Sequence, residues 1–460
     1  MLLSIAWGTL AFGAVYRWAY LPLVGACALT GLAALAAGRR ARPPIGALAI
    51  GFVAILLAIG LQLVPLSLPT LLRVSPATDA FLTQYDFTYQ LTPVPHPVSI
   101  APGKTMTGAL LCGAFALFLF GSARLLSVVG ARRITQWLIP FGGLLACFGI
   151  VQRIVTQADA RPLIYGFWQP RFESTPFGPF VNPNHFGGWM LMAIPLVLAT
   201  LLDETVRASE EAAGGRDRIG VFASSSFGII LLLGFTTAVM GLSLFMTRSR
   251  SAMAAFAVGC LIAGWIAFRR QTTGLARGGT IATILILLIG VVSWAGYDTI
   301  SSKFTEGQQS RGLLSRRQQA WRDTVDIMRR FPVTGSGMNT FGTAMMVYQS
   351  SNPGRHLQEA HNDYLQLASE GGLLVGIPIL VVFGIFIRDV RRRFREAPRT
   401  GSTYYLRVGA VVGLVSIALQ SLVEFSLQMP GNAALFVLLA AIALHQSPNL
   451  PARSPAAVRK

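Results

Sequence analysis

Residues 45–64 read IGALAIGFVAILLAIGLQLV, a stretch of twenty positions without a charged side chain. Because a helix needs about 20 apolar residues to cross the hydrocarbon core of a bilayer, this stretch predicts a transmembrane helix. The segment RRAR (39–42) lies just before it, separated by Pro43 and Pro44, and arginines beside a span are typical of the cytoplasmic side of a membrane. The sequence around residues 45–64 therefore predicts a membrane protein.

Apolar blocks of similar length recur along the whole chain. Hydrophobic residues make up 53% of the 460 positions, whereas charged residues make up only 12%, about half of their usual share in soluble domains. This composition excludes a disordered chain. The apolar blocks cover residues 2–16, 20–37, 45–64, 106–123, 134–155, 185–202, 224–246, 251–268, 280–297, 365–387, 405–427 and 431–446. We expect an all-α integral membrane protein with about 12 transmembrane helices.

The basic residues predict how these spans are oriented. Formal net charge is +19, with 38 Lys and Arg against 19 Asp and Glu. If the N-terminus is cytoplasmic, both RRAR (39–42) and RDVRRRFR (388–395) lie on the cytoplasmic side, as the positive-inside rule requires. Both termini are then cytoplasmic. Residues 2–16 lack a preceding basic flank, which argues against a signal peptide. Because basic residues are divided between both membrane faces, we expect no nucleic-acid partner.

This orientation divides the chain into four parts. The parts are nine transmembrane helices in 1–297, a long periplasmic loop in 298–364, three transmembrane helices in 365–446 and a cytoplasmic tail in 447–460. Two further outer loops of substantial length are expected at 65–105 and 156–184.

The sequence lacks the usual signals of a metal, nucleotide or disulfide site. The four cysteines lie inside apolar blocks and form no CxxC pair, so they are predicted to be buried small hydrophobic residues. The run APGKT (101–105) lacks the first glycine of a P-loop, and no HExxH, GxSxG or dinucleotide-binding GxGxxG pattern is found. We expect no bound metal and no cofactor.

The long outer loop contains the segment SRRQQAWRDTVDIMRRFPVTGSGMNTF (315–341). Ser315 followed by Gln318 is typical of a capping box, and Trp321 starts an apolar stripe that continues at Val325 and Met328. An amphipathic helix is therefore predicted. Arg317 shares the face of Trp321 and is expected to point toward the protein. A solvated helix followed by a turn is the alternative interpretation.

The segment HNDYLQLASEGGLLVG (361–376) predicts the start of a membrane helix. Asp363 and Gln366 again resemble a capping box. Glu370 lies about two turns inside, where an ionisable residue is a functional candidate, and the three side chains share one face that is expected to line a wet cavity. His361 lies just outside the helix, where a purely structural role is the alternative.

Other polar side chains are also predicted at the outer ends of spans. TRSRS (247–251) places Arg248 and Arg250 in a tight outer turn, where they either snorkel or bind a phosphate. Within PFVNPNHF (179–186), Asn184 is a candidate helix cap. Glu424 belongs to a predicted helical stripe with Gln420 and Gln428. Together these groups favour an anionic, phosphate-bearing substrate at the outer leaflet.

Four of these motifs, in this order, resemble a known family. They are SRS (249–251), the R-x-x-x-W helix of Arg317 and Trp321, the GSGMNTF loop and AHNDYLQLASEGG (360–372). The pattern resembles the O-antigen ligase/polymerase superfamily, the Wzy_C-type proteins. The resemblance implies a GT-C-like glycosyltransferase of the bacterial inner membrane with its active site facing the periplasm. Such an enzyme transfers an undecaprenyl-diphosphate-linked glycan to an acceptor hydroxyl, on lipid A–core or on a growing polysaccharide, without a metal.

The resemblance also implies roles for individual residues. Arg250 and Arg317 would hold the diphosphate, and His361 would act on the acceptor hydroxyl as a base. The further candidates for substrate binding are Arg248, Asn362, Glu370, Asn184 and Glu424. Many ligases carry His-x-His-Asn, whereas Glu359 occupies the first position here. The choice between ligase and polymerase, and between His361 and a carboxylate as the base, therefore stays open.

A transporter or flippase for an anionic or lipid-linked substrate is the alternative function. Transporters are built from internal repeats with broken helices near the membrane midplane. The two halves of this sequence show no convincing similarity, and the polar residues lie at the outer ends of the spans. The transferase interpretation is favoured for these reasons.

Overall fold

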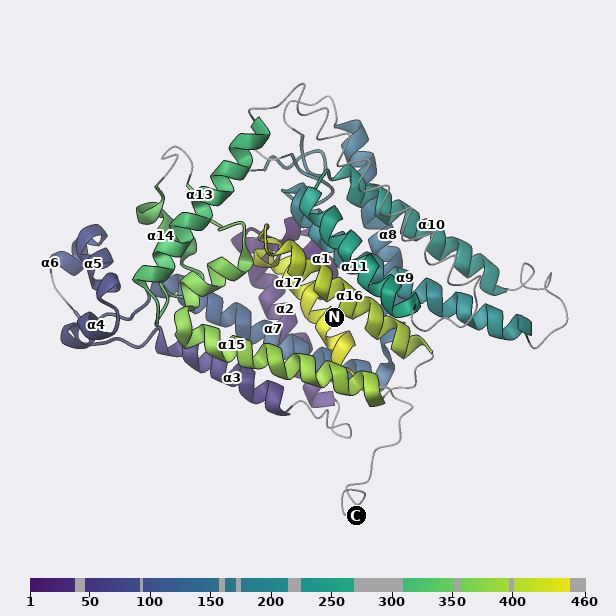
Figure 1. Cartoon of the computed structure of the whole chain (residues 1–460), viewed down its shortest axis with the longest axis horizontal. Coiled ribbons are helices and arrows are strands. Elements are labelled where there is room, and N and C mark those ends of the chain that lie inside the picture. Colours follow the sequence, from purple (N-terminus) through teal and green to yellow (C-terminus); the bar gives the residue numbers. More distant parts are fainter. Residues whose placement is uncertain are drawn as a thin grey trace, which may run out of the picture.

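The computed structural model describes residues 1–37, 46–91, 94–156, 162–170, 175–213, 225–268, 309–350, 356–396 and 401–446. These residues form α-helices and short turns (Figure 1). Within these ranges there is no β-strand, only isolated bridges such as the one between Leu66 and His96. The prediction of an all-α protein is thus confirmed for the described part of the chain.

The apolar blocks form the long helices. They are α1 (Leu2–Leu10), α2 (Arg17–Ala37), α3 (Gly46–Leu61), α7 (Pro102–Val129), α8 (Ala131–Val155), α9 (Pro183–Ala213), α10 (Ser225–Met246), α11 (Arg250–Phe268), α15 (Asp363–Glu396), α16 (Ser402–Gln420) and α17 (Pro430–Leu444). Seven of the described helices are long and apolar enough to cross a membrane, and three shorter ones are also apolar. The predicted span at 280–297 lies outside the described residues.

The first apolar block does not form the single spanning helix that was predicted. α1 has only nine residues and ends at Leu10. A 3-10 turn over Phe12–Ala14 follows, and Gly13 in this turn has φ 69°. Because the backbone changes direction there, the helix stays well below the roughly 20 residues that a span needs.

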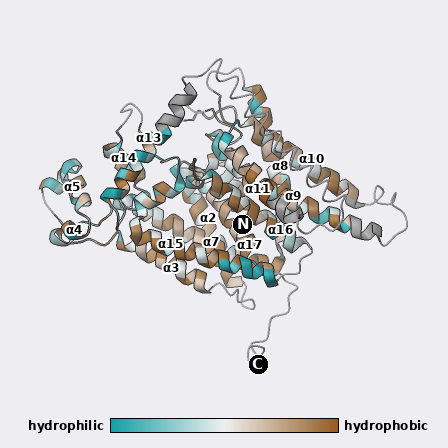
Figure 2. Ribbon diagram, in the orientation of Figure 1, coloured by the Kyte–Doolittle hydropathy of each residue, from teal (hydrophilic) through white to brown (hydrophobic). Residues whose placement is uncertain are grey.

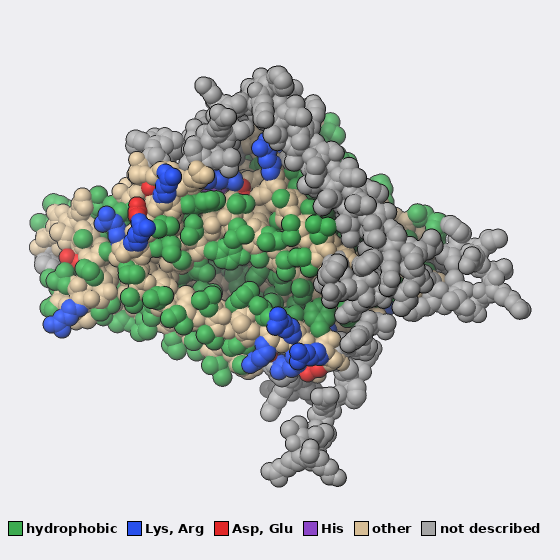
Figure 3. Space-filling view, viewed as in Figure 1, with side chains coloured by type: hydrophobic (Ala, Val, Ile, Leu, Met, Phe, Trp, Pro, Cys, Tyr) green, Lys and Arg blue, Asp and Glu red, His purple; other side chains and the backbone are tan. Residues whose placement is uncertain are grey.

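The surface of the bundle is apolar, as expected for helices that contact lipid. Ile50, Leu144 and Leu380 each expose at least 70% of their surface. Figure 2 shows that hydrophobic residues dominate the long helices, and Figure 3 shows a broad hydrophobic face with Lys and Arg side chains gathered at its margins. In water such an area would be a large exposed apolar patch, whereas in a bilayer it contacts acyl chains.

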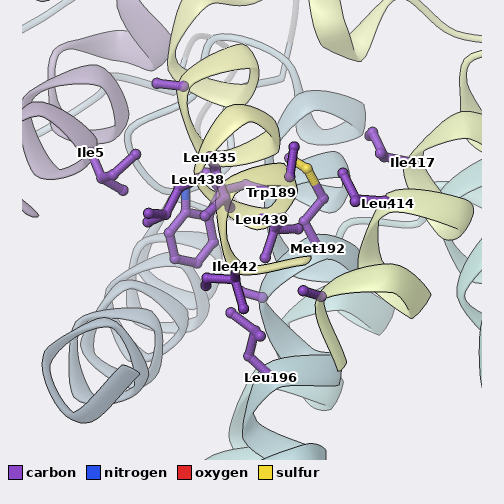
Figure 4. Packing of buried hydrophobic residues seen from close by; sticks show 14 of the residues in the cluster. Ile5, Trp189, Met192, Leu196, Leu414, Ile417, Leu435, Leu438, Leu439 and Ile442 are labelled. Carbon is purple, nitrogen blue, oxygen red and sulfur yellow. The ribbon is translucent and has the colours of Figure 1, made fainter. Parts of the chain in front are cut away.

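The core lies where α9 and α17 meet. Trp189 and Met192 of α9 pack among Leu435, Leu438 and Ile442 of α17, all of them buried (Figure 4). Glycines let neighbouring helices approach closely, as is common between membrane helices. For example, a Cβ on Gly31 of α2 would lie only 2.3 Å from the carbonyl oxygen of Leu117 in α7.

Five helices form a second layer at one end of the bundle. They are α4 (Leu68–Val74), α5 (Pro76–Tyr85), α6 (Phe87–Leu91), α13 (Gln309–Arg330) and α14 (Phe341–Tyr348). They share an apolar cluster that includes Leu71, Phe81, Ile327, Phe331 and Phe341. Residues of the predicted outer loops 65–105 and 298–364 therefore meet in one layer (Figure 1).

α13 is amphipathic, but two details of its prediction are wrong. The helix begins at Gln309, so Ser315 lies inside it and cannot be its cap. Ala320, Thr324 and Ile327 form the buried face, whereas Trp321 and Val325 are only half-buried. The buried stripe is therefore shifted by one residue toward the N-terminus from the predicted one.

Candidate active site

The start of α15 places His361. The helix begins at Asp363, as predicted, but its cap is Asn362, whose Oδ1 accepts the N–H groups of Tyr364 and Leu365, each at 3.0 Å. Gln366 reaches back instead, and its Oε1 accepts the N–H of Ala360 at 3.0 Å. Both ends of the short segment around His361 are therefore fixed by side chains of the helix start.

The turn after α16 holds the same segment from the other side. The N–H of Asp363 donates to the carbonyl of Ser421 at 3.0 Å, and Asn362 Nδ2 donates to the carbonyl of Leu422 at 2.9 Å. α16 ends at Gln420, and Glu424 lies in the turn that follows. The predicted continuous helical stripe through Gln420, Glu424 and Gln428 is therefore wrong, because the backbone leaves the helix before Glu424.

Three predicted site residues contact the side chain of Glu424. Its side chain is only 1% exposed. Oε1 forms a salt bridge with Nη2 of Arg317 in α13 and accepts a 2.8 Å hydrogen bond from Nδ2 of Asn184 in α9. Oε2 lies 3.5 Å from Nδ1 of His361. Residues separated by up to 240 positions in the sequence thus form one cluster, here called the Glu424 cluster.

The Glu424 cluster stabilises an ionised carboxylate. Burial by itself raises the pKa of Glu424, but the neighbouring imidazole of His361 and the charge of Arg317 outweigh it and hold the pKa below the ordinary value. Nδ1 of His361 is the ring nitrogen beside this carboxylate, and Nε2 is the second ring nitrogen, which can exchange a proton. A carboxylate that orients an imidazole in this way is the usual support of a general base.

The backbone of His361 is strained, and its ring is packed. Its φ is 51°, in the left-handed region that residues other than glycine rarely adopt. The ring contacts the ring of Phe425 edge-on at 4.7 Å, and His185 contacts the same Phe425 ring at 4.7 Å. The His361 side chain nevertheless keeps 28% of its surface exposed. Strain that neighbouring contacts maintain is typical of functional positions.

The start of α9 brings Asn184 to Glu424. Asn182 accepts the N–H of Asn184 on its Oδ1 at 2.9 Å, and Pro183 occupies the first helical position. Asn182 is therefore the cap, and the prediction that Asn184 caps the helix is wrong. Since the Asn184 side chain is not needed at the helix end, it is available for Glu424.

The TRSRS turn packs against the same region of α9. α10 ends at Met246, and α11 begins at Arg250, as the predicted tight turn requires. A Cβ on Gly187 of α9 would lie 2.9 Å from the Cβ of Ala252, so the first turn of α11 touches α9 two residues after His185. The side chains of Arg248 and Arg250 are exposed there.

Glu370 does not belong to the Glu424 cluster, because its hydrogen bonds are to another part of the protein. Its carboxylate accepts the N–H of Asn339 on Oε2 at 2.8 Å and the N–H of Phe341 on Oε1 at 2.9 Å, and the residue is 3% exposed. It therefore caps α14 and anchors the GSGMNTF loop. Asp363 and Gln366 on the same helical face are also buried against protein, whereas this face was expected to line a wet cavity.

Gln62 also holds the GSGMNTF loop, and sequence reasoning did not single it out. Its Nε2 donates to the carbonyls of Thr334 at 2.7 Å and Glu370 at 3.0 Å, while its Oε1 accepts the N–H of Met338 at 3.0 Å. The only signal in the sequence is that Gln62 is the single hydrogen-bonding side chain in the apolar stretch 45–64.

Glu359 is expected to make stability depend on pH. Its Oε2 accepts a 2.6 Å hydrogen bond from Nε2 of Gln366, and burial raises its pKa from 4.5 to about 8. Because the folded state binds this proton more tightly than the unfolded state, the protein loses stability as pH rises from about 4.5 to about 8. Glu359→Gln keeps an oxygen for Gln366 and removes the titration.

Thermal unfolding of the purified protein in detergent checks this expectation. The midpoints of wild type and Glu359→Gln should agree near pH 5, and the variant should unfold at a higher temperature at pH 9. Asp326→Asn, at an exposed carboxylate, should show no such divergence. A constant difference between wild type and Glu359→Gln across this range would contradict the assignment.

Comparison with known proteins supports the family resemblance. Residues 235–380 match the model of the Wzy_C family, described as O-antigen ligase. The resemblance predicted from the four motifs is thereby confirmed over this stretch, which contains Arg250, Arg317 and His361 but not Asn184 or Glu424. No match was found among the curated proteins. The family match indicates a glycosyltransferase-like membrane ligase that acts in polysaccharide biosynthesis.

Proposed function

We propose that this protein transfers a glycan from undecaprenyl diphosphate to an acceptor hydroxyl at the periplasmic end of the bundle. The Glu424 cluster is the observation that carries the proposal. In this cluster, an arginine that is suited to a diphosphate and a histidine that is suited to a hydroxyl both contact one buried carboxylate. Ligation to lipid A–core and polymerisation of a growing chain involve the same bond change, so the cluster serves either reaction.

His361 acts on the acceptor. Nε2 takes the proton of the hydroxyl while the hydroxyl oxygen attacks the anomeric carbon of the donor sugar. The bond between that carbon and the diphosphate oxygen breaks, and undecaprenyl diphosphate leaves with the bonding electrons. The imidazolium that forms is stabilised by Glu424, and its proton then passes to solvent.

The arginines stabilise the departing diphosphate. Arg317 uses one nitrogen for Glu424, and the remaining N–H groups of its guanidinium are donors suited to phosphate oxygens. Arg250 is the first residue of α11, where the helix dipole also favours an anion. Asn184 supports Glu424, Asn362 fixes the segment of His361, and Arg248 adds positive charge beside Arg250.

The protein is proposed to lie in the bacterial inner membrane with both termini in the cytoplasm. The layer of α4–α6, α13 and α14 then faces the periplasm. The opposite end of α15 carries exposed arginines, among them Arg388, Arg391 and Arg395, which the positive-inside rule assigns to the cytoplasm. In Figure 3 a basic group lies at the margin of the hydrophobic face near this end.

Reconstituted vesicles test the proposed function. Purified protein should convert undecaprenyl-diphosphate-linked glycan and acceptor into glycosylated acceptor and free undecaprenyl diphosphate. Movement of intact donor across the bilayer, with no change in its covalent structure, would identify a flippase and overturn the proposal.

Transfer is expected to continue in excess chelator. Because arginines supply the positive charge that a divalent cation would otherwise provide, the initial rate with EDTA should stay within about twofold of the rate without it. A glycosyltransferase with a known requirement for Mg²⁺, assayed in the same vesicles, is the control. Loss of transfer in EDTA followed by recovery with Mg²⁺ or Mn²⁺ would disprove the arginine mechanism.

A further inference from the structure

The contact with Glu424 leaves the orientation of the His361 ring incompletely fixed. The 3.5 Å between Nδ1 of His361 and Oε2 of Glu424 is longer than an ordinary N–H···O hydrogen bond. Within the described residues Nδ1 has no hydrogen-bond partner, and part of the side chain is exposed to solvent. The ring must therefore be oriented by the side chain against which it packs.

Phe425 is the aromatic side chain that packs against His361. The two ring centroids are 4.7 Å apart and the ring planes are at 85°. Phe425 lies in the turn between α16 and α17, outside both helices, and it is only half-buried. Residues in turns are more mobile than residues in packed helices. Phe425 therefore orients His361 only if its own ring is restrained by a neighbouring element.

His185 supplies this restraint from the start of α9. Its ring contacts the Phe425 ring at 4.7 Å with an angle of 77° between the planes. The side chain is buried, and the carbonyl of His185 accepts a 3.0 Å hydrogen bond from Nδ2 of Asn432 in α17. α9 and α17 form the core of the bundle. A continuous series of contacts thus leads from this core through His185 and Phe425 to His361.

We propose that His185 is a positioning residue that holds the Phe425 ring and thereby orients His361, an inference that rests on the proposed transferase function. Both ring nitrogens of His185 are buried and lack a hydrogen-bond partner within the described part of the chain. His185 thus acts on the site through the packing of its ring and not through a hydrogen bond. Orientation matters for a base, because a displacement of about 1 Å can cost about 10²-fold in rate.

Steady-state transfer kinetics in vesicles test the proposal. His185→Ala should lower kcat about 10–10²-fold, with the KM values for donor and acceptor nearly unchanged, because the buried side chain contacts neither substrate. His185→Phe keeps an aromatic ring and should retain most of the activity. His185→Gln keeps a hydrogen-bonding group without the ring and should behave like His185→Ala. His96→Ala removes another histidine with an edge-on aromatic contact, to Tyr89, and should leave kcat unchanged.

A double-mutant cycle separates positioning from a general loss of packing. If His185 acts through His361, His185→Ala should change the residual rate of His361→Asn by less than about twofold. An equal fold loss in both backgrounds would show a structural role and overturn the proposal. Phe425→Leu removes the ring that contacts both histidines and keeps an apolar side chain. It should lower kcat as His185→Ala does, and it serves as the second variant where a His185 variant does not fold.

NMR of protein with isotope-labelled histidine reports on the His361 ring without any transfer. The chain has five histidines, and the signal that disappears in His361→Asn identifies His361. Because the Phe425 ring current shifts this signal, Phe425→Leu should displace it, and His185→Ala should displace it in the same direction. An unchanged His361 signal in His185→Ala would overturn the proposal, as would activity that is retained in His185→Gln but lost in His185→Phe. Absence of transfer by wild-type protein would instead refute the transferase function, and the NMR result would still decide whether His185 orients His361.

Discussion

Replacing His361 by asparagine is expected to lower the rate of glycan transfer by about 10²–10⁴-fold, the usual contribution of a general base. Nδ1 of His361 lies 3.5 Å from Oε2 of Glu424, and in the proposed mechanism Nε2 takes the proton of the acceptor hydroxyl. Asparagine is the suitable substitution because it tolerates the left-handed backbone that this position requires, so the turn should persist. Transfer in vesicles with both substrates at saturation gives the rate.

Two further measurements decide whether His361 acts as a base. The variant should bind the lipid-linked donor as tightly as wild type does, because the proposed mechanism assigns the diphosphate to Arg250 and Arg317. In His361→Ala, which leaves space for a ring, added imidazole should restore part of the activity. In cells, donor should accumulate on the outer leaflet. Wild-type rates in His361→Asn and His361→Ala would remove His361 from the chemistry.

The spans were predictable because a bilayer imposes a minimum apolar length. α2, α7, α8, α10 and α15 lie where the apolar blocks predicted them. Hydropathy does not report where the backbone turns inside an apolar stretch. The left-handed residues Phe12, Gly13 and Ala14 end the first helix early. α16 ends at Gln420, before Glu424, although the predicted apolar block continues to residue 427.

The sequence indicated candidate residues for the site but not how they are arranged. The order of motifs indicated Arg250, Arg317 and His361, since each motif is local in sequence. The meeting of Asn184 with Glu424 depends on the packing of α9 against α16, which no local pattern encodes. Phe425 belongs to none of the motifs in the sequence, and its position beside both histidine rings becomes visible only in the structure.

Removing the side chain of Arg317 is expected to lower transfer by about 10²–10³-fold, the cost of losing a charged donor that acts on the leaving group. Arg317→Ala has a second consequence, because Glu424 would keep a buried charge without its arginine partner. A loss of activity in this variant alone would therefore not show that Arg317 binds the diphosphate. Arg330→Ala, an exposed arginine on the same helix that lies over Tyr348, is the matched control and should retain activity.

The double variant Arg317→Ala with Glu424→Gln separates the two roles of the arginine. If Arg317 only neutralises Glu424, removing both charges should return transfer to the level of Glu424→Gln alone. If Arg317 binds the diphosphate, the double variant should stay about 10²-fold or more below Glu424→Gln, because the leaving group still lacks its donor. In the background that keeps Glu424, Arg317→Lys should restore little, since an ammonium cannot hold Glu424 and a phosphate oxygen with the spacing of a guanidinium. Recovery of the double variant to the Glu424→Gln rate would assign Arg317 to the support of Glu424 and leave Arg250 as the arginine that stabilises the departing diphosphate.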